Sequence, residues 1–121
     1  MPDAATLYKQ AALSTLTGPA LVAKLFEGLG IFVRQAQQAG QNGDWEEAHR
    51  QLLRGEDILA VLRGTLDFRY EEVASGLDAL YAFYYHRLVE ADLHHDEGLL
   101  PEIQQFAEEW FETWQKVAHS T

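Results

Sequence analysis

Few side chains in this sequence have the types and spacing that metal chemistry requires. Glu46 and His49 form a Glu-x-x-His step on a predicted helix. A four-helix bundle holds two metal ions with two such steps and one further Glu from each of the other helices. The first long predicted helix offers only Glu27, opposite its apolar stripe, and the last contains no Glu-x-x-His. A solvated helix start explains Glu46 and His49 better, and we predict no metal site.

Other reactive residue types also lack the partners that catalysis needs. His94, His95 and Asp96 follow one another near a predicted helix end, where a protonated His is favoured, but adjacent helical positions point in different directions. The sequence has no Cys, no nucleophile elbow around a Ser and no Gly-rich phosphate loop. Trp110 and Trp114 lie one turn apart, which core packing explains better than a ligand platform. We therefore predict neither an enzyme nor a bound cofactor.

Charge and composition exclude further classes of protein. The 121 residues include 9 Lys and Arg against 19 Asp and Glu, which gives a formal net charge of −10. This charge repels a phosphate backbone, so a nucleic acid is not an expected partner. With 47% hydrophobic and 12% aromatic residues, the chain is too apolar for a disordered acidic tail. Its length fits one domain.

The N-terminus and the apolar runs favour a cytoplasmic protein. The first residues lack the basic start and apolar stretch of a secretory signal. The longest apolar run, residues 79–85, is much shorter than a membrane span. We therefore expect a cytosolic location without membrane insertion.

Apolar residues recur at helical spacing through nearly the whole chain. Pro19 suits a first helical position, and Asp44 with Glu47 has the pattern of a capping box. Pro101 would disrupt a helix interior, so we expect a short turn from Asp96 and the last helix from about Pro101. The predicted helices span about 19–39, 45–67, 71–94 and 101–118.

Four amphipathic helices with short connections predict an all-α fold, an antiparallel up-down four-helix bundle. We expect this bundle to occupy residues 17–121 as a single domain. Residues 1–16 precede it as a short N-terminal strap or helix.

Some apolar and small residues remain outside the predicted core stripes when each helix is placed on a wheel of about 100° per residue. Small residues beside large apolar ones allow another helix to approach and pack closely. We therefore predict a groove for a partner helix on the second and third bundle helices. Its candidate residues are Leu53, Val61, Gly64, Gly76 and Phe83. Alternatively, the N-terminal segment covers this patch, either permanently or in alternation with a partner.

Several short motifs follow one another in an order typical of one family. Tyr8-Lys9-Gln10 resembles a Tyr-containing N-terminal motif, and Thr17-Gly18-Pro19 resembles a Ser-Pro opening. Residues 77–81, Leu-Asp-Ala-Leu-Tyr, and residues 87–91, Arg-Leu-Val-Glu-Ala, are similar to the family's Leu-Asp-x-Leu-Tyr and Arg-Leu-x-x-Ala-Asn runs, with Asp92 in place of the final Asn. By these motifs the chain resembles the flagellin-specific export chaperones, the FliS family.

The resemblance implies a helical bundle that binds the disordered C-terminal segment of flagellin. Such a chaperone prevents premature polymerisation and escorts flagellin to the flagellar type III export apparatus, where the export gate and other regulators are possible further partners. In relatives the segment wraps the bundle partly as helices and the N-terminal strap gives way to it. Here Leu7 and Tyr8 would belong to that strap. The main alternative is a homo-oligomeric structural bundle, such as a homodimer, without a flagellin client.

Overall fold

Helices make up most of the chain. The computed structural model describes residues 4–120, with side chains from residue 9 onward. Within that part the chain is all-α, as predicted, and no β-strand is present. The α-helices are α1 (Ala4–Leu13), α2 (Pro19–Gln41), α3 (Trp45–Gly64), α4 (Glu71–His94) and α5 (Leu100–His119), with short 3₁₀ helices η1 (Phe68–Tyr70) and η2 (Glu97–Leu99).

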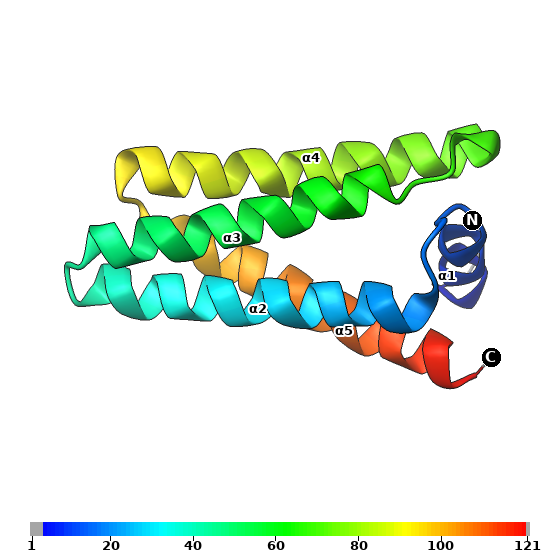
Figure 1. The fold of residues 1–121 in the computed structure, drawn as a ribbon, viewed down its shortest axis with the longest axis horizontal. Helices are drawn as coiled ribbons and strands as arrows, with labels where there is room; N and C mark the ends of the chain where they lie inside the picture. Colours follow the sequence, from blue (N-terminus) through cyan, green and yellow to red (C-terminus); the bar gives the residue numbers. More distant parts are fainter. Residues whose placement is uncertain (1–3, 121) are drawn as a thin grey trace.

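The four long helices form an elongated bundle (Figure 1). Helix α2 packs against α3 and α5, and α3 packs in turn against α4. In the view of Figure 1, α5 crosses behind α2 and α3. The shorter α1 stands across the end of the bundle at which α2 begins and α3 ends. None of the described helices is long and apolar enough to cross a membrane.

Local signals explain where the helices begin. Pro19 occupies the first turn of α2 after an extended Gly18. Asp44 caps α3 by accepting a hydrogen bond from the Glu47 backbone N–H at 3.1 Å. The reciprocal half of the predicted capping box is not formed, because the Glu47 carboxylate binds Arg50 and Gln51 instead.

Helix α3 ends at Gly64, earlier than the predicted residue 67, because the following residues pair with the segment between α1 and α2. The Leu16 N–H donates to the Thr65 carbonyl at 2.7 Å, and the Asp67 N–H donates to the Ser14 carbonyl at 2.6 Å. These bonds flank an isolated bridge between Thr15 and Leu66. The pairing joins two segments that lie far apart in sequence.

The connection between α4 and α5 contains a sharp reversal. His95 closes α4 in the left-handed conformation, with φ of 50°. The Asp96 carboxylate accepts a hydrogen bond from the Gly98 N–H at 3.0 Å, which holds η2. Helix α5 then begins at Leu100, with Pro101 in its first turn.

Aromatic side chains fill the centre of the bundle. Phe26 of α2 lies 6.1 Å from Tyr81 of α4 and 5.6 Å and 5.7 Å from Phe106 and Trp110 of α5, measured between ring centroids. Burial raises the pKa of Tyr81 far above its ordinary value. Gly55 lets α3 approach closely, since a Cβ there would lie 3.2 Å from Leu88 and 3.4 Å from Leu29.

Candidate partner-binding surface

Helix α3 lies between α2 and α4. Its outward residues therefore lie along one of two seams, the α2–α3 seam or the α3–α4 seam. On the α2 side, the Ile58 Cδ1 atom would lie 3.1 Å from a Cβ built on Gly28. On the α4 side, the Arg63 Nε atom donates to the Asp78 carboxylate at 2.8 Å. The two contacts fix which side of α3 faces each neighbour.

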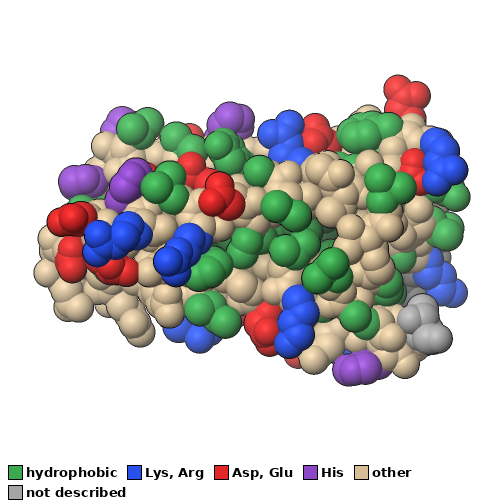
Figure 2. Space-filling model, viewed as in Figure 1, with side chains coloured by type: hydrophobic (Ala, Val, Ile, Leu, Met, Phe, Trp, Pro, Cys, Tyr) green, Lys and Arg blue, Asp and Glu red, His purple; other side chains and the backbone are tan. Residues whose placement is uncertain are grey.

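One apolar strip follows the outer seam between α2 and α3. Arg54 of α3 lies over the Phe32 ring of α2, 5.6 Å from its centroid. Toward the α1 end of this seam the side chains are aliphatic. We call Leu21, Leu25, Phe32, Ile58 and Val61 the α2–α3 strip. Leu21 and Val61 are exposed, while the other members are half-buried. Hydrophobic side chains gather over the middle of the face that shows α2 and α3 (Figure 2).

A second apolar strip follows the edge where α4 meets α5. Tyr84 of α4 stacks on Phe106 of α5 at 3.9 Å, and the exposed Phe83 meets Tyr84 edge-on at 5.1 Å. Arg87 lies over the Phe83 ring at 5.3 Å and approaches Glu102 of α5 at 3.8 Å. We call the half-buried or exposed residues of this edge the α4–α5 strip. Its members are Val73, Leu80, Phe83, Tyr84 and Trp110.

The five candidates from the sequence do not come together in one groove. Val61 lies on the α2 side of α3, and Leu53 lies on the opposite, α4 side by its helical position. Phe83 lies on the α5 side of α4, where Arg87 and Tyr84 contact it. Gly64 and Gly76 have open space, because a Cβ at either would meet no atom within 4 Å.

The sequence pattern alone does not distinguish several members of the two strips from core residues. Leu25 and Tyr84, for example, lie on the apolar stripes of their own helices. In the structure both are half-buried at the edge of the core. A single-helix wheel cannot separate an edge position from a central one, because the difference depends on where the neighbouring helix lies.

The strap residues Leu7 and Tyr8 lie outside the part of the chain whose side chains the structure describes. The backbone of α1, to which they belong, is described. At its end Ala11 is buried, and the Ser14 hydroxyl donates to the Ala11 carbonyl at 2.9 Å. The end of α1 is therefore attached to the bundle.

The Glu and His side chains considered above as metal ligands form other contacts in the structure. His49 Nδ1 lies 2.5 Å from the Asp92 carboxylate, and Glu46 lies 3.5 Å from Arg50. His95 stacks flat on Trp45, with ring centroids 4.6 Å apart. Among the residues that the structure describes, no group of three His, Asp or Glu side chains is arranged to hold a metal ion.

The fold and the two strips define a class of protein: an all-α bundle with apolar side chains left exposed along its seams, as on proteins that bind other proteins. Comparison with known proteins narrows the class. The sequence matches the model of the family described as "Flagellar protein FliS" over residues 1–121. It is 31% identical over 115 residues to the flagellar secretion chaperone FliS of Bacillus subtilis (strain 168), an alignment that covers 95% of this chain and 86% of that protein. The chain belongs to the FliS family of flagellar secretion chaperones.

Proposed function

We propose that the protein is a cytoplasmic chaperone for flagellin. It binds the disordered C-terminal segment of flagellin, prevents its premature polymerisation and escorts it to the flagellar type III export apparatus. Membership of the FliS family supports this proposal. The observation that carries it is the pair of apolar strips on different sides of the bundle.

Binding on two strips has a physical advantage for this client. A disordered segment loses conformational entropy when it folds on a partner, so a large buried interface is needed for useful affinity. A segment that wraps from the α2–α3 strip to the α4–α5 strip would bury more apolar surface than one groove allows. Because bound flagellin cannot polymerise, the equilibrium shifts away from assembly by mass action.

The rest of the surface suits a protein with exposed apolar strips. The net charge of −10 favours solubility and opposes self-association through the strips. We propose that α1, which carries Leu7 and Tyr8, acts as a strap that yields when the client binds. Backbone hydrogen bonds of Ser14 and Leu16 join the link that follows α1 to the segment that follows α3.

Charge introduced into each strip separately tests the proposal. Val61→Glu alters the α2–α3 strip and Phe83→Glu alters the α4–α5 strip; both side chains are exposed, so helicity should not change. Each change should weaken binding of a flagellin C-terminal peptide about tenfold or more, which corresponds to about 1.4 kcal/mol. The affinity is measured by calorimetry and the helicity by circular dichroism.

Two further variants make this test specific. Leu93→Glu is the matched control, because Leu93 is 73% exposed near the end of α4 and belongs to neither strip. Leu53→Glu tests the remaining large candidate, on the seam between α3 and α4. Wild-type affinity in both Val61→Glu and Phe83→Glu would show that the client does not use these strips.

A further inference from the structure

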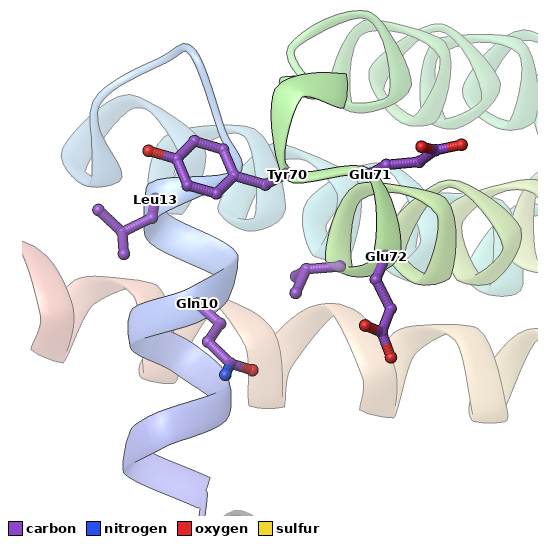
Figure 3. A pocket seen from close by; sticks show the side chains of 6 residues that line it. Gln10, Leu13, Tyr70, Glu71 and Glu72 are labelled. Atoms are coloured by element: carbon purple, nitrogen blue, oxygen red, sulfur yellow. The ribbon is translucent and has the colours of Figure 1, made fainter.

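A small hollow opens between α1 and the beginning of α4 (Figure 3). Its volume is about 290 Å³, and it is lined by Gln10, Leu13, Tyr70, Glu71, Glu72 and Val73. The Tyr70 ring lies beside Leu13 at one side of the hollow, and Gln10 lies lower on α1. A hollow of this size is smaller than most small-molecule sites, which are about 300–1,000 Å³, and suits one bulky side chain.

Exposed apolar side chains line this hollow or lie on the paired segments next to it, at the same end of the bundle. Single exposed apolar residues are common on protein surfaces. Here four occur on α1, on η1 and on the link that follows α1. We call them the end patch: Leu13 (63% exposed), Leu16 (65%), Phe68 (53%) and Tyr70 (45%). Four large exposed side chains on adjoining segments, two of which line a hollow, indicate a contact surface rather than scattered exposure.

The backbone beneath the end patch is held in place. The Asp67 N–H donates to the Ser14 carbonyl at 2.6 Å and the Leu16 N–H donates to the Thr65 carbonyl at 2.7 Å. The Asp67 carboxylate also accepts the backbone N–H of Arg69 at 3.0 Å, within η1. A partner would therefore meet a surface that is already organised, which lowers the entropic cost of binding.

The rim of the hollow carries two acidic side chains that are exposed to solvent. Glu71 and Glu72 are exposed, and neither forms an ion pair with a described residue. The neighbouring cation, Arg69, is bound by the Asp67 carboxylate at 2.7 Å. Two unpaired carboxylates beside an apolar hollow are complementary to a segment that combines an apolar side chain with Lys or Arg.

From these features we infer that the hollow and the end patch form a docking site for a basic amphipathic segment of a second partner protein. One bulky apolar side chain fills the hollow, and flanking Lys or Arg side chains pair with Glu71 and Glu72. A second copy of this chain is a poorer occupant, because each copy carries a net charge of −10. The inference does not depend on flagellin as the client, although Val73 belongs both to the α4–α5 strip and to the lining of the hollow.

The probe is an amphipathic peptide of leucine and lysine, about 15 residues long, added to the isotope-labelled full chain. A leucine–glutamate peptide of the same pattern is the control ligand. Saturable NMR shifts are expected at Gln10, Leu13 and residues 71–73 with the lysine peptide and not with the glutamate peptide. Shifts spread over the acidic surface without saturation would overturn the inference.

Substitutions in the hollow and the end patch test whether the lysine peptide binds there. Leu13→Asp combined with Tyr70→Ala should weaken binding of the lysine peptide about tenfold or more, while Leu93→Asp should leave it within about twofold. Glu71→Gln with Glu72→Gln should weaken binding and reduce its dependence on salt. If Leu13→Asp loses helicity, Leu13→Ser replaces it in the same experiment.

Two results would assign the surface to another occupant and so contradict the inference. A dimer seen by light scattering that disappears in the Leu13→Asp and Tyr70→Ala variant would assign it to a second copy. Loss of flagellin-peptide binding in the same variant would make the hollow part of the client surface. If flagellin binding is unchanged while the lysine peptide is lost, both the inference and the separate client surface are supported.

Discussion

At the scale of single residues, Glu56 is the clearest departure from ordinary surface chemistry. Its side chain, on α3, is 8% exposed, and its Oε2 atom has no hydrogen-bond partner in the described structure. Burial raises the pKa of the Glu56 carboxyl, and the Asp92 and Asp57 carboxylates raise it further, while His49 opposes them. The ionised form of Glu56 is therefore disfavoured in the folded protein.

This environment predicts that Glu56→Gln stabilises the protein at neutral pH. A carboxyl whose pKa is raised by folding costs stability once the unfolded chain ionises, above about pH 4.3. The gain in the free energy of unfolding should be about 1 kcal/mol at pH 7 and should shrink as the pH falls toward 4. Urea unfolding at pH 7 and pH 4.5 measures this difference. An equal gain at both pH values, or an equal gain in the exposed control Glu112→Gln, would contradict the assignment.

At the scale of elements, a buried carboxylate lies beside the backbone pairing that attaches the end of α1, because the Asp67 N–H takes part in that pairing. Asp67 accepts the Arg69 guanidinium at 2.7 Å and the Arg69 N–H at 3.0 Å. These hydrogen bonds lower the pKa of Asp67. A lowered carboxyl pKa stabilises the folded state above the unfolded value, about 3.9, and that contribution is lost as the pH falls toward the lowered pKa.

Asp67→Asn should therefore loosen the pairing between the link that follows α1 and the segment that follows α3. The Asn side chain keeps the shape but loses the charged acceptor that holds Arg69. Hydrogen exchange at the Leu16 and Asp67 backbone amides should become several-fold faster at pH 7, while core amides of α2 remain protected. Asp96→Asn is the matched control, because Asp96 has the same capping role in η2. Unchanged exchange at Leu16 would show that the backbone pairing holds without the carboxylate.

The sequence was informative about elements wherever the signal was local. Pro19 and Asp44 lie at the starts of α2 and α3, since a proline ring and a capping carboxylate act within one turn. The predicted end of α3 at residue 67 is wrong, because the residues after Gly64 take part in a pairing between Asp67 and Ser14 that no local pattern shows. The interhelical contact of His49 with Asp92 was likewise invisible from spacing alone.

The candidate groove illustrates the same limit. A wheel gives the direction of Val61 and Leu53 around one axis. It does not show on which sides of α3 the helices α2 and α4 pack. The choice of exposed apolar residues was therefore possible from the sequence, whereas their division between separate sides required the arrangement of helices.

At the scale of the whole molecule, a large negative net charge accompanies exposed apolar surface. Aromatic residues such as Phe26 and Trp114 are buried in the bundle, so they do not account for its exposed apolar surface. Much of that surface lies on the two strips and the end patch, while Ile31, Leu53 and Leu93 are exposed outside them. The net charge of −10 opposes association of copies of the chain through this apolar surface.

Titration of the full chain with a flagellin C-terminal peptide tests the central proposal most directly. Calorimetry should show saturable binding of one peptide per chain, with a negative heat-capacity change from apolar burial. Circular dichroism of the mixture should show more helix than the sum of the separate components, because the segment folds as it binds. An absence of binding heat together with additive helix signals would contradict the proposal that this protein is a flagellin chaperone.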